Sequence, residues 1–159
     1  MNFCSACGKP VIQRIPDGDS RLRYVCDHCQ TIHYQNPNIV AGVLPTHGSQ
    51  VLLCRRAIEP RRGFWTLPAG FMENGETIDQ AARRETVEEA CARVGEMRLY
   101  QLFDLPHINQ VHLFFRAELA DLDYAVGVES LEVRLFEEHE IPWDHLAFRT
   151  VARTLECYY

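Results

Sequence analysis

Apolar and polar residues alternate along much of the chain after residue 38, and this pattern predicts strands. In residues 131–136, leucine and valine side chains alternate with two charged ones, as expected for a strand with one buried face. His47-Gly48 separates two runs rich in β-branched residues and predicts the turn of a hairpin. The other strand candidates are residues 22–25, 39–44, 50–55, 64–68, 98–105 and 110–119.

Two segments have the pattern of helices. Residues 77–94 open with Thr77 and Gln80, which have the spacing of a capping box, and strong helix formers follow. Residues 143–158 predict a closing helix that turns Leu146, Val151 and Leu155 inward. The mixture of strands and helices predicts an α/β (α+β) fold.

The first 35 residues differ from the rest because four cysteines gather there, in two Cys-x2-Cys pairs eighteen residues apart. This spacing is typical of a tetrahedral zinc site. The alternatives are two reduced pairs without metal, or a redox pair. Zinc is favoured because so small a region has no other means of fixing its fold. We therefore predict a structural zinc ribbon at 1–35, in which the zinc ligands are Cys4, Cys7, Cys26 and Cys29. A second domain is predicted at 36–159.

Composition narrows the class of protein. A length of 159 residues suits one catalytic domain with a small appendage. The net charge of −6 disfavours a nucleic-acid surface, although local arginines and a metal can still attract an anionic small molecule. Seven cysteines without an export signal or a long apolar run predict a reducing compartment, the cytoplasm. Cys54, Cys91 and Cys157 are predicted to be buried thiols.

Three glutamates, Glu85, Glu88 and Glu89, share one face of the predicted helix because they are three and four positions apart. Like charges at this spacing repel one another. The arrangement is favourable if a hard divalent cation lies among them, and oxygen ligands suit Mg²⁺ or Mn²⁺. The alternative for the glutamates alone is an ordinary exposed acidic face.

The surrounding residues favour the metal, because the segment resembles the Nudix box. In that family a glycine, a glutamate and an Arg-Glu-x-x-Glu-Glu core follow one another at fixed distances. The matching residues are Gly70, Glu76, Arg84, Glu85, Glu88 and Glu89, and the lead-in from Trp65 to Gly70 is also similar. Thr86 stands where an aliphatic residue is usual, and Cys91 where glycine is usual.

The resemblance implies a fold, an α/β/α sandwich around a mixed sheet, and a role for each residue. Glu85 and Glu89 would be the principal metal ligands, together with the backbone carbonyl of Ala69. Glu88 would bind a second metal or orient the attacking water, and Arg84 would hold Glu76 or Glu88 in place. The implied chemistry is attack of water on one phosphorus of a diphosphate, assisted by divalent metal.

Further short segments, residues 15–18, 34–37, 129–132 and 141–144, also resemble one group within this family. Through them the whole chain is similar to zinc-ribbon pyrophosphohydrolases that act on FAD and ADP-ribose. NADH pyrophosphatases remain an alternative, although the segment 101–110 lacks their Pro- and aromatic-rich signature. A non-catalytic ligand sensor or nucleic-acid-binding regulator is another. The resemblance also implies a homodimer, to which Val111–Phe115 would contribute. The candidate substrate contacts are Arg55, Arg62, Phe103 and Glu129, with Arg56 and Arg61 as further basic candidates.

Overall fold

The computed structural model describes all residues, 1–159, and contacts divide the chain into two compact units, Met1–Asn36 and Pro37–Tyr159. The first unit is a small antiparallel sheet in the order β1-β2-β3, and its two ladders place Ile12 opposite Val25 and Val25 opposite Ile32. Its strands are β1 (Ile12–Arg14), β2 (Arg23–Val25) and β3 (Ile32–His33).

The second unit is built on a mixed sheet. Its main order is β10-β5-β4-β9-β8, with β6 paired to β5 and β7 paired to β4. The β4–β9 ladder is parallel and the others are antiparallel. The strands are β4 (Asn38–His47), β5 (Gln50–Arg56), β6 (Trp65–Thr66), β7 (Ala69–Phe71), β8 (Arg98–Leu105), β9 (Gln110–Glu118) and β10 (Ser130–Phe136).

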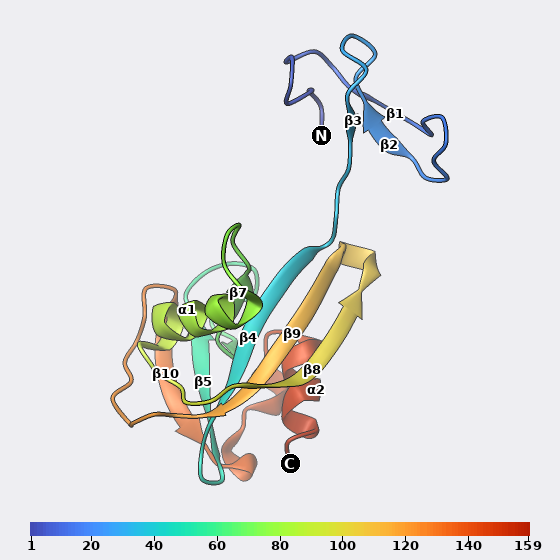
Figure 1. Cartoon of the computed structure of the whole chain (residues 1–159). Coiled ribbons are helices and arrows are strands. Elements are labelled where there is room, and N and C mark those ends of the chain that lie inside the picture. Colours follow the sequence, from blue (N-terminus) through green and yellow to red (C-terminus); the bar gives the residue numbers. More distant parts are fainter. The chain divides into compact units, whose positions relative to one another are not determined.

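Helices α1 (Ile78–Ala90) and α2 (Arg149–Glu156) cover opposite faces of this sheet (Figure 1). Alanines of α1 pack with Ala41, Val43 and Leu52 in one core cluster. Val151 and Leu155 of α2 pack in a second cluster on the other face. The mixed sheet between two helices confirms the predicted fold class. Neither helix is long and apolar enough to cross a membrane.

Two predicted helix boundaries were wrong. Helix α1 ends at Ala90 rather than near residue 94, because Cys91 takes a left-handed conformation with φ of 48°. The closing helix is interrupted after a short 3-10 turn, Trp143–His145, and resumes at Arg149. There the Ala147 amide donates to the Trp65 carbonyl at 2.7 Å, so the chain pairs with β6 instead of continuing a helix. Val151 and Leu155 are buried as predicted, whereas Leu146 is only half-buried.

Candidate metal and active site

The capping box at the start of α1 sets the position of its glutamates. Thr77 Oγ1 accepts from the Gln80 amide at 3.2 Å, and Gln80 Oε1 accepts from the Thr77 amide at 2.7 Å. These reciprocal bonds satisfy two amides that a helix start would otherwise leave unpaired. Two to three helical turns later, Glu85 and Glu89 are buried against the sheet, while Glu88 remains exposed.

Arg84 links the acidic side chains of the site. Its guanidinium donates two bonds to Glu76, from Nε at 3.1 Å and from Nη2 at 2.8 Å. Nη1 donates to Glu85 Oε1 at 2.6 Å and to Glu88 Oε2 at 3.1 Å. A guanidinium keeps its donors in a rigid fork, so one side chain can fix the positions of three carboxylates. The sequence predicted that Arg84 pairs with Glu76 or Glu88, and in the structure Arg84 pairs with both.

Glu85 lies against the backbone of β7. A Cβ built on Gly70 would come within 2.3 Å of the Glu85 carboxylate, a distance that real contacts do not allow. Gly70 is therefore needed because the carboxylate occupies the space of a side chain. Burial is the largest effect on Glu85 and raises the pKa of its carboxyl, while the hydrogen bond from Arg84 opposes this rise.

Glu89 is the most deeply buried carboxyl of the group, with 5% of its surface exposed. Burial, followed by the nearby charge of Glu85, raises the pKa of Glu89 to about 8. The Ala69 amide, 3.4 Å from Glu89 Oε2, and the charge of Arg56 act in the opposite direction. A buried carboxylate needs a compensating positive charge, and a divalent cation supplies one. The oxygen-only donor set of Glu85 and Glu89 thus fits a hard divalent metal.

Gly127 is a site residue that the sequence did not reveal. Its amide donates to the Glu89 carbonyl at 3.1 Å, and the Ala125 amide donates to the Ala90 carbonyl at 2.9 Å. These two bonds satisfy carbonyls that a helix end leaves unpaired. A Cβ on Gly127 would lie 1.9 Å from the Glu88 carbonyl, so only glycine fits. A lone glycine in a polar loop carries no signal that predicts this contact.

The structure accommodates one departure from the Nudix box and gives no reason for the other. Thr86 is fully buried, and its hydroxyl donates to the Ala82 carbonyl one turn earlier at 2.8 Å, so no polar group is left unpaired. Cys91 occupies the left-handed position at the helix end, where glycine is favoured because it lacks a Cβ. The prediction that Cys91 and Cys157 are buried was wrong, since both are exposed, whereas Cys54 is buried.

The predicted substrate contacts are dispersed. The charge of Glu129 contributes, as the smallest cause, to the raised pKa of both Glu85 and Glu89, so Glu129 is near enough for its charge to act on them. Arg55 instead contacts the Gly63 carbonyl and, at 3.6 Å, Glu132. Arg62 is exposed. Phe103 is half-buried and packs edge-on against Phe114 in the core cluster of α2, across the sheet from α1.

The four cysteines of the first unit converge on one point. Their sulfur atoms all lie within 4.8 Å of one another, with 3.6 Å between Cys4 and Cys29 and 3.5 Å between Cys7 and Cys26. Four thiolates around one zinc ion stand about 3.8 Å apart when each Zn–S bond is about 2.3 Å. The Thr31 hydroxyl, 3.1 Å from Cys29 Sγ, and the Thr31 backbone lower the pKa of Cys29 to about 6, whereas the pKa of Cys7 is raised, so the geometry of the four sulfurs and not their pKa values supports zinc.

A mixed sheet between two helices, with an Arg-Glu-x-x-Glu-Glu core on the first helix, defines the Nudix class of proteins. Residues 36–155 match the family described as NUDIX domain, and residues 2–35 match the family described as Nudix N-terminal, a zinc ribbon. The chain belongs to the Nudix family and carries its N-terminal zinc ribbon, as the sequence predicted.

Among solved structures, a NUDIX hydrolase from Nitrosomonas europaea is 60% identical, with a TM-score of 0.95 over 99% of this chain and 90% of that one. Curated relatives include the NAD-capped RNA hydrolase NudC of Edwardsiella ictaluri, 33% identical over 79% of this chain and 45% of the relative. NudC of Pseudomonas syringae pv. tomato is 32% identical over 96% of this chain and 53% of the relative. The chain thus spans about half the length of these curated relatives.

Proposed function

We propose that this chain is a divalent-metal-dependent pyrophosphohydrolase that cleaves the diphosphate bond of a nucleoside diphosphate-linked metabolite and releases AMP. The observation that carries the proposal is the joint arrangement of Glu76, Glu85 and Glu88 around Arg84, with Glu89 buried beside them. A ligand sensor has no use for a carboxylate cluster held this tightly for a cation.

In this proposal, Glu85 and Glu89 hold the metal, joined by the backbone carbonyl of Ala69. The bound metal, Mg²⁺ or Mn²⁺, offsets charge on the phosphoryl oxygens and makes a coordinated water more acidic. Glu88, exposed and held at one oxygen by Arg84, either orients the attacking water or binds a second ion. Glu76 serves Arg84, because both its oxygens accept from that guanidinium.

The resemblance of the whole chain favours FAD or ADP-ribose as the substrate. NAD-linked diphosphates form the second candidate, because the relatives from Edwardsiella ictaluri and Pseudomonas syringae bear the name NAD-capped RNA hydrolase. Glu129 is the predicted contact whose charge acts on Glu85 and Glu89, so we propose it as a substrate-side or metal-side ligand. We propose Arg55 and Arg62 as contacts made by a bound substrate that reaches beyond the metal site, but not Phe103, because it packs on the face of the sheet that α2 covers.

The test is release of AMP from FAD, ADP-ribose and NADH, and of nicotinamide mononucleotide from NAD-capped RNA, each offered separately with Mg²⁺ and with a chelator. We expect Mg²⁺-dependent release from at least one of them. Glu88→Gln and Glu89→Gln should each lower the rate by about a hundredfold or more, as removal of charge-stabilising groups does elsewhere. Glu156→Gln, on the exposed face of α2, is the matched control and should retain full activity. Turnover within a few-fold of the parent in the first two variants would refute the assigned roles.

Two further proposals concern the protein's setting. A reducing compartment, the cytoplasm, is supported by the four thiols that must stay reduced to hold zinc.

A homodimer is supported by exposed Leu99 and Leu102 on β8, which neighbour Phe115 and Leu113 of β9 on the face that α1 only partly covers. Light scattering measures the mass in solution of the parent and of the Leu102→Glu variant. We expect a dimeric parent and a monomeric variant, and a monomeric parent would refute the homodimer.

A further inference from the structure

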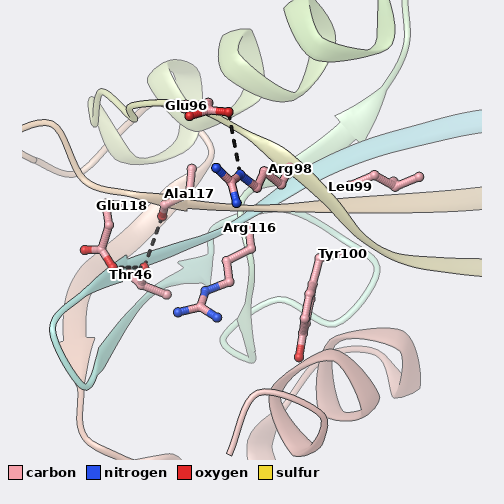
Figure 2. Close-up of a pocket in the computed structure, with 8 residues that line it drawn as sticks. All are labelled: Thr46, Glu96, Arg98, Leu99, Tyr100, Arg116, Ala117 and Glu118. Atoms are coloured by element: carbon pink, nitrogen blue, oxygen red, sulfur yellow. Dashed lines mark hydrogen bonds and ion pairs between the residues drawn. The ribbon is translucent and has the colours of Figure 1, made fainter.

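A groove of about 640 Å³ opens where the first residues of β8 lie beside the last residues of β9 (Figure 2), and no residue of α1 lines it. Its lining includes two arginines, Arg98 and Arg116, and the aromatic ring of Tyr100. We propose that this groove is a binding site for a nucleoside monophosphate, with the arginines on the phosphate and Tyr100 against the base. The proposal is independent of the proposed hydrolysis, because none of the metal-site residues lines the groove.

The two arginines stand side by side, and the protein's own carboxylates neutralise them only weakly. Arg98 stands directly opposite Arg116 in the antiparallel β8–β9 ladder, so both side chains leave the same face of the sheet. Like charges in this position repel. Arg98 has only a 3.5 Å contact with Glu96, in which both side chains are about four-fifths exposed, and Arg116 forms no ion pair. A phosphate between the guanidiniums would turn the repulsion into attraction.

Aromatic contacts hold the groove in shape. The Arg116 guanidinium lies over the ring of Tyr158, 4.8 Å from its centroid, which leaves the N–H groups at its edge free to donate. The Tyr100 hydroxyl donates to the Cys157 carbonyl at 2.7 Å and fixes its ring beside the opening (Figure 2). A fixed aromatic ring next to a pair of guanidiniums suits a ligand that joins a planar base to a phosphate.

The acidic groups of the groove refine the class of ligand. Glu118 Oε1 accepts from the Thr46 hydroxyl at 2.9 Å, and Glu96 lies on the other side of Arg98 (Figure 2). Carboxylate oxygens accept hydrogen bonds from ribose hydroxyls and from amino groups of bases. They also oppose the entry of a highly charged polyphosphate. A nucleoside monophosphate, which carries one phosphate together with a ribose and a base, matches both features.

The test is an NMR titration of the zinc-loaded full chain with AMP, inorganic phosphate and adenosine, in separate experiments without Mg²⁺. AMP should shift the amides of Leu99, Ala117 and Glu118, and phosphate and adenosine should shift them only at higher concentration. The double variant Glu85→Gln/Glu89→Gln should bind AMP in the groove as the parent does. Unchanged AMP binding by this variant would show that the groove binds AMP independently of the metal site. Loss of AMP binding in the variant would show instead that AMP binds at the metal site, and would overturn the proposal.

Variants decide whether the arginines are responsible. Arg116→Gln should weaken AMP binding at least about tenfold. Arg116→Lys keeps the positive charge but loses the planar set of guanidinium donors, so its affinity for AMP should lie between those of the parent and of Arg116→Gln. Arg93→Gln is the matched control, because Arg93 is an exposed arginine paired with Asp121 outside the groove. It should stay within about twofold of the parent. The proposal is overturned if about 10 mM AMP leaves the groove amides unmoved, or if Arg116→Gln binds AMP as tightly as Arg93→Gln does.

Discussion

Replacing Glu89 by glutamine should change how the stability of the metal-free protein depends on pH. The pKa of Glu89 rises from an ordinary 4.5 to about 8 in the folded protein, mainly because the carboxyl is buried. Between these values the folded state holds a proton that the unfolded chain has released. The free energy of unfolding therefore falls as pH rises, by up to about 1.4 kcal/mol per pH unit. The loss should reach on the order of 4 kcal/mol between pH 5 and pH 8.

The sign follows from the raised pKa. The stabilising contribution is fully present below pH 4.5 and is lost as pH rises through about 8. The raised pKa of Glu85 acts in the same direction. Glutamine at position 89 cannot titrate, so the slope of the variant should be smaller by almost one proton. Saturating Mg²⁺ should flatten the parent's slope, because metal binding requires the ionised carboxylate.

Urea unfolding measured at several pH values provides the assay. Both tryptophans, Trp65 and Trp143, lie in the second unit, so their fluorescence follows that unit without interference from the zinc ribbon. A weak chelator that removes Mg²⁺ but leaves zinc in place keeps the first unit intact. If the parent and Glu89→Gln lose stability in parallel from pH 5 to pH 8, then Glu89 is already ionised without metal and the burial argument is wrong.

Four other substitutions test separate contacts. Gly70→Ala should leave the fold intact but abolish most of the hydrolysis, because its methyl group displaces the Glu85 carboxylate; unchanged kcat would contradict this. Cys91→Gly should raise the free energy of unfolding by about 1 kcal/mol, since glycine takes the left-handed conformation without strain, as thermal unfolding would show. Arg84→Lys should cost at least about tenfold in kcat, because one ammonium cannot span three carboxylates. Cys26→Ser should lower the zinc content measured by elemental analysis to well below one ion per chain, and full occupancy would exclude the four-thiolate site.

Much of the architecture was predictable because local patterns and tertiary structure agree. Strand β8 has the predicted bounds, 98–105, and β9 and β10 differ from theirs by one residue. Strand β7 escaped prediction because its residues, Ala69–Phe71, have little strand character and become a strand only by pairing with β4. The closing helix was predicted too long because the pairing of Ala147 with Trp65 is a long-range contact.

The site divides in the same way. Residues at fixed sequence spacing, such as Glu85 and Glu89, were found because a helix converts spacing into proximity. Among residues from distant segments, Glu129 was named only through the family resemblance, and Gly127 was not found at all. The candidate arginines before the box illustrate the limit. Sequence could not tell which of them faces the carboxylates, and only the fold shows that the charge of Arg56 reaches Glu89.

The contact between Gly127 and the last turn of α1 has a consequence for protein engineering. The amides of Ala125 and Gly127 clamp the helix end from a loop more than thirty residues downstream. Anyone grafting that loop from a relative, to change which compound is accepted, would also shift the acidic side chains that one turn of helix carries. Substrate preference and turnover number would then change together. Keeping Gly127 and the two amide contacts of the loop offers a way to change one without the other.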